Sequence, residues 1–380
     1  MIHVVLVGAT GSIGRSTLDI VRALAPEVRL LGVFAGSNVD DLARIAREFD
    51  VRYAAVEDPA GQGRLRESLP GVLTGSCDEL LEEAIGDGET DVVVSAATGA
   101  AGLPASLAAV RHGKTLALAN KESVVMAGPI LLRAAGATGA RILPVDSEHS
   151  AIFQALRAGR PGETRRVILT ASGGPFRSWS AERLAAATPE EALQHPTWSM
   201  GRKITVDSAT MMNKALEVIE ARWLFDLDPD QIEVVIHPQS VVHSMVEFID
   251  GSIVAQMGRP DMRLPIQYAL TYPERRGSGF GGFEVEDFKK LTFEEPDRER
   301  FPALDLGYRA ARLGGTAGAI VNAANEVAVE RFLDGQIPFP AVADTVGQVL
   351  DDATIQMEPT LDDIHAADRA AREDAAKCRI

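Results

Sequence analysis

The sequence is poor in cysteine and in positive charge. Its 380 residues include only two cysteines, Cys77 and Cys378, which match no metal-binding or redox spacing. The chain therefore fits a reducing cytoplasm without disulfide bonds. Lys and Arg number 38 against 54 Asp and Glu, a net charge of −16. This excess of acid argues against nucleic acid or an anionic membrane as the main partner, so an anionic substrate would need a local basic pocket.

The sequence also lacks a long uninterrupted hydrophobic run. Residues 92–110 carry no charge, but Gly99, Gly102 and Pro104 interrupt them, which favours a strand, loop and helix over a membrane span. Residues 1–7 lack the basic start of a signal peptide and are expected to form the first strand. The length and a hydrophobic fraction of 46% predict a globular chain of two or three domains.

Glycines follow the first predicted strand in the stretch Gly8-Ala-Thr-Gly-Ser-Ile-Gly14, and a helical pattern comes next. Such a turn lets the backbone approach a pyrophosphate, which then lies at the helix N-terminus. A glycine turn that binds nothing is the alternative, because the spacing differs from G-x-G-x-x-G. The second strand, residues 29–35, ends in Gly36-Ser37-Asn38, without the acid that an NAD enzyme places there. That absence tolerates a 2′-phosphate and favours NADP.

Further strand and helix patterns alternate up to residue 119, which predicts a doubly wound parallel sheet of the Rossmann-like α/β class. The predicted strand 114–119 delivers Asn120-Lys121-Glu122 at its carboxyl end, the edge where open α/β sheets bind ligands. Lys121 is therefore a candidate contact to substrate or cofactor. The alternative is a solvated loop lysine paired with Glu122.

Asp146 and Glu148 follow a short buried strand at residues 141–145. Side chains at positions i and i+2 of an extended segment project to one side, so the two carboxylates can converge on one point. They would need a shared proton, a cationic neighbour or a divalent metal to remain ionised together. Alternatively, Ser147 caps a helix over residues 151–157 and the acids favour its positive end.

Small and polar residues follow the predicted strand 166–171 as Ser172-Gly-Gly-Pro-Phe176, which suits a phosphate, although a plain turn is an alternative. Residues 188–203 are loop-like. Trp198 on this loop predicts a lid that excludes water, or simply an anchor onto the core.

A helix is predicted over residues 206–220, N-capped near Asp207 or Ser208. Asn213 and Glu217 share one face, and with Lys214 they form a cluster that could hold a phosphate and a metal together. A solvated face with a Lys–Glu pair is the alternative.

The later sequence predicts a hairpin over residues 241–257 with Asp250-Gly251 at its turn. His237 and His243 are expected to be hydrogen-bonded core residues rather than metal ligands. We predict a nucleotide-binding domain over 1–146, a catalytic α/β domain over 147–271, a linker over 272–299 and a C-terminal helical bundle over 300–380.

Taken in order, these motifs resemble the 1-deoxy-D-xylulose 5-phosphate reductoisomerase family over the full length of the chain. The motifs that carry the resemblance are Gly8–Gly14, Ala119–Ser123, Pro144–His149, Ser172–Phe176, His195–Lys203, Val206–Glu217, Ile236–Ser240 and Asn322–Glu326. The resemblance implies a homodimer that uses NADPH and one Mg²⁺ or Mn²⁺.

The resemblance also implies roles for individual residues. The metal ligands would be Asp146, Glu148 and Glu217, and the catalytic residues Lys121, Glu148, Glu217 and His195. The substrate would contact Lys121, Ser147, Glu148, Ser172, His195, Trp198, Ser208, Asn213, Lys214 and Glu217. NADPH would contact Thr10, Gly11, Ser12, Ile13, Gly36, Ser37, Asn38, Asn120, Glu122 and Gly201. Ser37 departs from the basic residue expected at its position, and Arg15 is the candidate substitute donor.

The implied reaction converts 1-deoxy-D-xylulose 5-phosphate to 2-C-methyl-D-erythritol 4-phosphate at the entry to the non-mevalonate isoprenoid pathway. The metal acts as a Lewis acid on the substrate ketone and a neighbouring hydroxyl during a retro-aldol and aldol rearrangement. NADPH then reduces the resulting aldehyde, under a lid at residues 188–203 that keeps water out.

Two other classes of protein share the glycine turn. Extended short-chain dehydrogenases need Tyr-x-x-x-Lys, but the residues at that spacing after the four tyrosines are Glu57, Tyr272, Arg276 and Arg312. Semialdehyde dehydrogenases need a central nucleophilic cysteine, and neither cysteine fits. A non-catalytic NADP sensor remains as an alternative, and it predicts cofactor binding without dependence on a metal.

Overall fold

The structure is a computed structural model, and it describes residues 1–198, 200–282 and 284–379. The chain divides into two compact units. The first unit comprises Met1–Ser123, Leu131–Ser150 and Asp261–Gly281, and the second comprises Val124–Ile130, Ala151–Pro260 and Gly282–Ile380. Lys121 and Asp146 therefore belong to the first unit, and Glu217 belongs to the second.

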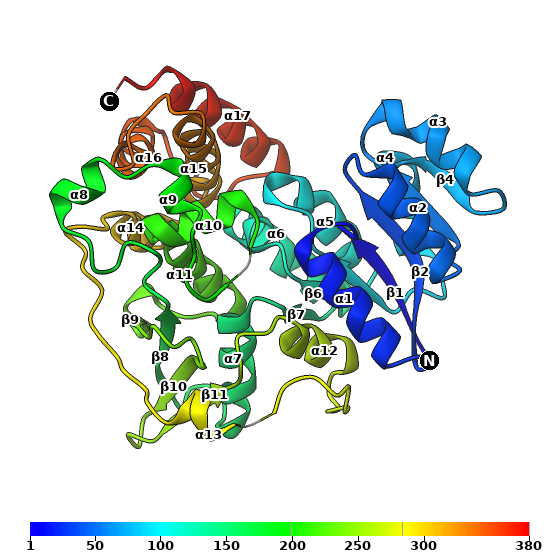
Figure 1. The fold of residues 1–380 in the computed structure, drawn as a ribbon, viewed down its shortest axis with the longest axis horizontal. Helices are drawn as coiled ribbons and strands as arrows, with labels where there is room; N and C mark the ends of the chain where they lie inside the picture. Colours follow the sequence, from blue (N-terminus) through cyan, green and yellow to red (C-terminus); the bar gives the residue numbers. More distant parts are fainter. Residues whose placement is uncertain (199, 283, 380) are drawn as a thin grey trace. The chain divides into compact units, whose positions relative to one another are not determined.

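The first unit is built on a parallel sheet of seven strands, in the order β4-β3-β2-β1-β5-β6-β7 (Figure 1). The central position of β1 explains its sequence, because Val4, Val5 and Leu6 are fully buried, as in a strand covered on both faces. The strands are β1 (Ile2–Val7), β2 (Val28–Ala35), β3 (Tyr53–Val56), β4 (Leu73–Ser76), β5 (Val92–Ser95), β6 (Thr115–Leu118) and β7 (Ile142–Pro144).

The helices of this unit confirm the predicted doubly wound arrangement. They are α1 (Ser12–Ala23), α2 (Val39–Glu48), α3 (Pro59–Ser68), α4 (Cys77–Gly86), α5 (Leu103–Arg111) and α12 (Arg263–Thr271), while α6 (Lys121–Thr138) and α7 (Ser147–Ala155) contribute residues to both units. Strands β2, β3 and β4 are added in turn on one side of β1, and β5, β6 and β7 are added in turn on its other side. Right-handed crossovers therefore place α1–α3 on one face and α4 and α5 on the other.

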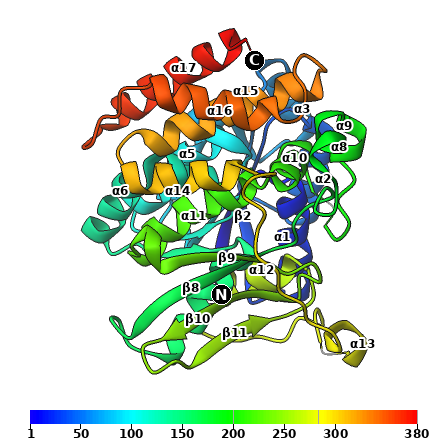
Figure 2. The same ribbon diagram turned by 90° about the vertical axis from the view of Figure 1, so that its left-hand side faces the viewer.

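The second unit contains a four-stranded mixed sheet in the order β11-β10-β8-β9 (Figure 2). Its strands are β8 (Thr164–Ala171), β9 (Ile232–Ile236), β10 (Val242–Phe248) and β11 (Ile253–Met257). β8 and β9 are parallel, whereas β10 pairs antiparallel with both β8 and β11. The predicted hairpin is confirmed, and Gly251 at its turn has a φ of +84°, which glycine adopts without strain.

Helices account for most of the second unit. They are α8 (Ala181–Ala185), α9 (Pro189–Ala192), α10 (Arg202–Thr210), α11 (Met212–Phe225), α13 (Val285–Phe288), α14 (Ala303–Leu313), α15 (Ala317–Leu333), α16 (Ala341–Asp352) and α17 (Leu361–Lys377). The last four lie within residues 300–380, where the sequence predicted helices. The ring of Phe339 packs against both Phe176 and Phe332, with centroids 4.9 and 5.7 Å away, which joins the bundle to the loop after β8 in one core.

Two predicted helix starts are wrong. The single helix expected from residue 206 is two helices, because Met211 adopts a left-handed conformation with φ of +65° between α10 and α11. Asp207 and Ser208 therefore lie inside α10 and do not cap a helix. In addition, α7 begins at Ser147 and not at Ala151. The elements that the sequence patterns did not indicate include α2, α3, β4, α6 and α12.

Within the predicted linker, Glu294 forms a β-bridge to Ile236 at the end of β9. His237, the next residue, is fully buried, and its Nδ1 lies 2.9 Å from the carbonyl oxygen of Thr292. This confirms His237 as a hydrogen-bonded core residue. None of the helices in the described ranges is both long enough and apolar enough to span a bilayer.

Candidate functional site

The turn between β1 and α1 can only be built with glycine at two positions. Gly8 has a φ of +87°, and a Cβ atom on Gly14 would lie 2.3 Å from the carbonyl oxygen of Gly8. Gly11, the N-cap residue of α1, and Ser12 are exposed, and no side chain caps the helix. The first amide groups of α1 are therefore left for a ligand, and this tight cradle fits a pyrophosphate.

The turn after β2 lies next along the same edge of the sheet. Gly36, Ser37 and Asn38 are exposed, and a Cβ atom on Gly36 would meet no atom within 4 Å. The side chain of Asn38 caps α2 by accepting a hydrogen bond from the amide of Asp41 at 3.2 Å. This open surface leaves room for the adenosine end of a dinucleotide.

Asn120 is a buried N-cap residue of α6. Its Nδ2 donates to the carbonyl oxygens of Ala97 and Gly99, each at 2.9 Å, and to Glu122 at 3.0 Å. The fit is tight, because a Cβ atom on Gly102 would lie 2.4 Å from the Asn120 side chain. The structure thus gives Asn120 a clear local role, and its predicted contact with NADPH remains a prediction.

Lys121 and Asp146 form a largely buried ion pair. The Lys121 Nζ atom lies 2.9 Å from Asp146 Oδ2, and only 7% and 12% of the two side chains are exposed. The alternative of a solvated loop lysine is therefore wrong. Asp146 Oδ1 accepts the amide of Glu148 at 3.1 Å, and Ser147 donates its hydroxyl to Glu148. Asp146, rather than Ser147, thus caps the start of α7.

Glu217 belongs to a buried polar cluster on α11. Its carboxylate accepts hydrogen bonds from Asn213 and forms an ion pair with Lys214. Glu217 is 1% exposed and Lys214 is 3% exposed. The alternative of a solvated face is therefore wrong. Buried charges are costly unless they are paired or used, so this cluster is a strong candidate for function.

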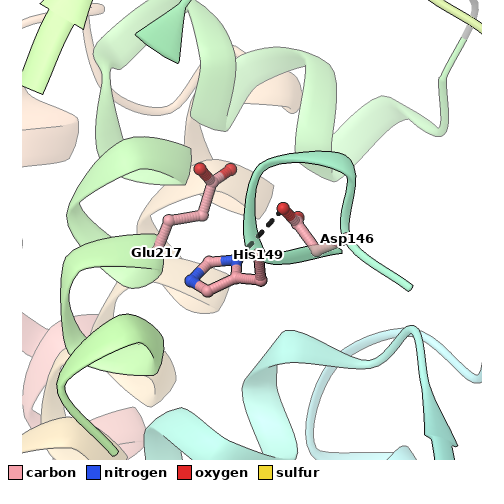
Figure 3. Close-up of side chains that lie close together, drawn as sticks. All are labelled: Asp146, His149 and Glu217. Atoms are coloured by element: carbon pink, nitrogen blue, oxygen red, sulfur yellow. Dashed lines mark hydrogen bonds and ion pairs between the residues drawn. The ribbon is translucent and has the colours of Figure 1, made fainter. Parts of the chain in front are cut away.

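Figure 3 shows Asp146, His149 and Glu217, whose candidate ligand atoms lie within 4.8 Å of one another. The two carboxylates are predicted ligands, and an acid-rich donor set fits a hard divalent cation. The sequence analysis assigned no role to His149, which ends the motif Pro144–His149. Its side chain is fully buried, and its Nδ1 lies 3.1 Å from Asp146 Oδ1. Among the described residues this group does not include Glu148, so its predicted role as a ligand stays a prediction.

The loop after β8 carries Ser172 and reaches the residues predicted for phosphate. Gly173 and Gly174 have φ values of +83° and +66°, and a Cβ atom on Gly174 would lie 2.6 Å from the carbonyl oxygen of Ser208. The turn that follows Ser172 therefore packs at Gly174 against the backbone of α10 at Ser208. The plain-turn alternative does not explain why the turn packs so closely on α10.

His195 is fixed in one orientation. Its Nδ1 accepts the amides of Thr197 and Trp198 at 3.1 and 2.9 Å, and its Nε2 lies 3.0 Å from Ser172 Oγ. Burial lowers the pKa of His195 below its usual value, so the neutral ring is favoured. With Nδ1 occupied as an acceptor, the proton lies on Nε2 and is donated towards Ser172.

The predicted lid, residues 188–203, includes short helix α9 and the first residues of α10. Ser199 lies outside the described residues. The Trp198 ring is 6.4 Å from the His243 ring, which shows contact with the sheet region and leaves the choice between lid and anchor open. Gly201 is exposed and forms the N-cap of α10.

Sequence reasoning missed the tertiary role of Asp207. This carboxylate is 1% exposed, lies 2.9 Å from Lys203 Nζ and accepts a hydrogen bond from Asn325 at 2.8 Å. It thereby ties α10 to α15. The i, i+4 spacing of Lys203 and Asp207 was a visible signal, but the partner on α15 was not.

Comparison with known proteins gives a consistent result along the chain. Three family models match the chain. The model of 1-deoxy-D-xylulose 5-phosphate reductoisomerase matches residues 4–128, and the model of the C-terminal domain of that enzyme matches residues 142–225. The model of the DXP reductoisomerase C-terminal domain matches residues 257–374. The reductoisomerases of Pelotomaculum thermopropionicum and Heliobacterium modesticaldum are 50% and 51% identical over 99% of this chain and 98% and 97% of their own.

Solved structures agree. The reductoisomerase from Zymomonas mobilis in complex with NADPH is 45% identical, with a TM-score of 0.92 over 99% of this chain and 98% of that one. A DOX-P reductoisomerase in complex with NADPH, fosmidomycin and magnesium is 42% identical, with a TM-score of 0.94 and the same coverage.

Proposed function

The chain belongs to the 1-deoxy-D-xylulose 5-phosphate reductoisomerase family, and we propose that Asp146, Glu148 and Glu217 hold the divalent metal of its reaction. The reaction rearranges 1-deoxy-D-xylulose 5-phosphate and reduces the product with NADPH, to give 2-C-methyl-D-erythritol 4-phosphate. When bound, Mg²⁺ or Mn²⁺ supplies a Lewis acid that stabilises negative charge on the substrate oxygens. The proximity of candidate ligand atoms on Asp146 and Glu217 carries this proposal.

In this proposal Lys121 holds Asp146 in place and moves protons. The 2.9 Å ion pair holds one oxygen of the Asp146 carboxylate, and the other oxygen contacts the Glu148 amide and the His149 ring. A buried ammonium next to the reacting hydroxyls can donate and recover a proton as the carbon–carbon bond is broken and remade. Ser147 donates to Glu148 and so orients that carboxylate for the substrate.

We assign the substrate phosphate to the second unit. Ser172, Ser208, Asn213 and Lys214 supply hydroxyl, amide and ammonium donors, which are the groups that bind phosphate. Burial lowers the pKa of His195 and favours its neutral form, and its Nε2 lies 3.0 Å from Ser172 Oγ, so His195 orients the Ser172 hydroxyl as a donor to the phosphate. Its two bonds from the amides of Thr197 and Trp198 couple this donor to the predicted lid.

We assign NADPH to the carboxyl edge of the sheet in the first unit. The pyrophosphate would lie at the start of α1, against Thr10, Gly11, Ser12 and Ile13, and the adenosine would lie at Gly36, Ser37 and Asn38. Asn120, Glu122 and Gly201 complete the proposed set. The tight Gly8–Gly14 turn with an uncapped α1 N-terminus supports this assignment.

An assay of NADPH oxidation with 1-deoxy-D-xylulose 5-phosphate, with and without a chelator, tests the proposed function. Oxidation that requires both the sugar phosphate and a divalent metal is expected. NADPH binding without turnover would instead support the non-catalytic NADP sensor, and turnover insensitive to the chelator would contradict the metal site.

We also propose a homodimer that forms along the edge strand β11, in a cytoplasmic setting that suits two free cysteines. Beyond β11 no further strand pairs in the described ranges, and Ile253 and Met257 on it are 55% and 42% exposed. An exposed apolar edge strand favours pairing with a second copy about a twofold axis. Ile253→Lys should shift the sedimentation coefficient to that of a monomer, whereas Val285→Lys, at an equally exposed site on α13, should not.

A further inference from the structure

The region around Ser37 lacks the positive charge that an NADPH site needs at the end of β2. In dinucleotide-binding folds this turn approaches the ribose, and a basic residue nearby accommodates the 2′-phosphate. Ser37 is exposed and neutral. A cation that recognises the 2′-phosphate must therefore come from a neighbouring element of the first unit.

Arg15, in the first turn of α1, reaches this place. Its Nε lies 3.4 Å from the carbonyl oxygen of Thr10, and its Nη2 lies 2.9 Å from Asp41 Oδ2 in the first turn of α2. Asp41 is also the residue whose amide Asn38 caps. The guanidinium thus bridges the glycine turn and the first turn of α2, the helix that Asn38 caps, while 61% of the side chain remains exposed.

The charges around Arg15 leave its own charge available. The Asp41 carboxylate is shared between Arg15 and Arg44, whose Nη2 lies 2.6 Å from Oδ1. The other acid of the first turn of α2, Asp40, pairs with Arg64 at 2.9 Å. Arg44 is divided between Asp41 and Glu48, whereas among the described residues Arg15 forms an ion pair with Asp41 alone. Arg15 is therefore the better placed of the two for a new anion.

We propose that Arg15 binds the 2′-phosphate of NADPH and so determines the preference of this enzyme for NADPH over NADH. A guanidinium has five N–H donors, and its contacts with Thr10 and Asp41 use two of them. The remaining donors can engage a phosphate in a bidentate pair, which a serine hydroxyl cannot provide. The inference rests on the proposed assignment of NADPH to the Gly8–Gly14 turn.

The test compares the dissociation constants of NADPH and NADH, measured by nicotinamide fluorescence on the purified full chain. Arg15→Ala should weaken NADPH binding by about 10- to 100-fold, since a charge-assisted pair is lost, and should change NADH binding by less than about twofold. Arg47→Ala is the matched control, because Arg47 lies at the far end of α2 and contacts the Ser68 carbonyl oxygen. It should leave both constants unchanged.

A second variant tests whether the preference for NADPH can be restored. Adding Ser37→Arg to Arg15→Ala should restore most of the preference for NADPH, because it supplies a guanidinium from the turn after β2, next to the α2 turn that Arg15 contacts. Failure to restore the preference would overturn the proposal. Equal weakening of both cofactors by Arg15→Ala, or no change in either, would also overturn it. Wild-type protein that binds neither cofactor would instead contradict the proposed NADPH site.

Discussion

The turn at Gly8–Gly14 and the helix α11 offer different kinds of chemical group to the ligands that we propose for them. The turn presents backbone amides, and its side chains are small or absent because a Cβ atom on Gly14 would lie 2.3 Å from the Gly8 carbonyl oxygen. Helix α11 presents side chains, and Lys214 and Glu217 are almost fully buried there. A site made of backbone is thus recognisable from glycine spacing, whereas a site made of buried side chains is not, because sequence does not display burial.

The largest expected effect comes from removing a charge from α11. Glu217→Gln keeps the size of the side chain but removes a proposed metal ligand from the buried cluster with Asn213 and Lys214. We expect kcat to fall by about 1,000-fold or more, since the metal supplies several kcal/mol of stabilisation. Glu330→Gln, at an exposed position on α15, should keep kcat within about twofold of wild type. Full activity in Glu217→Gln would remove α11 from the site.

Substitutions of two glycines test whether the Gly8–Gly14 turn requires residues without a side chain. Gly14→Ala should lower the free energy of unfolding by about 2–4 kcal/mol, because its Cβ atom cannot be accommodated between backbone atoms. Gly36→Ala, where a Cβ atom meets nothing within 4 Å, should change it by less than about 0.5 kcal/mol. Urea denaturation measures both. Similar free energies of unfolding for the two variants would show that the backbone of the turn can move to accommodate a Cβ atom on residue 14.

The link between α10 and α15 should have an intermediate effect. Asp207→Ala would remove the buried carboxylate that accepts from Asn325 and pairs with Lys203, and we expect a loss of about 2–3 kcal/mol in the free energy of unfolding. Asp228→Ala, at the exposed N-cap of the turn before β9, should cost about 1 kcal/mol or less. Thermal unfolding compares them, and a smaller loss for Asp207→Ala than for Asp228→Ala would contradict the buried link.

The smallest expected effect concerns pH. Burial lowers the pKa of His195 in the folded chain, so the unfolded chain takes up this proton first as pH falls. The contribution of His195 to stability should therefore be complete above its usual pKa of about 6.5 and be lost below it. Protonation would also remove the acceptor for the amides of Thr197 and Trp198. An NMR titration that places the pKa of His195 at or above 6.5 would contradict this.

The sequence predicted the fold of the first unit well, because buried parallel strands and the glycine turn leave strong local patterns at β1 and α1. It predicted Asp146 and Glu217 as a pair of ligands only through the family resemblance. The break at Met211 was missed, since a left-handed residue between two helices depends on tertiary contacts such as that between Asp207 and Asn325. The burial of Lys121 was not predicted either, because it depends on a tertiary contact with Asp146.

Metal binding tests the central proposal most directly. Titration of the purified chain with Mn²⁺, followed by electron paramagnetic resonance in the presence of NADPH, should give one bound ion per chain. Asp146→Asn and Glu217→Gln should each weaken that binding by at least about 10-fold, because each removes a candidate ligand atom of the same ion. Wild-type affinity in either variant would contradict a metal held jointly by these two acids.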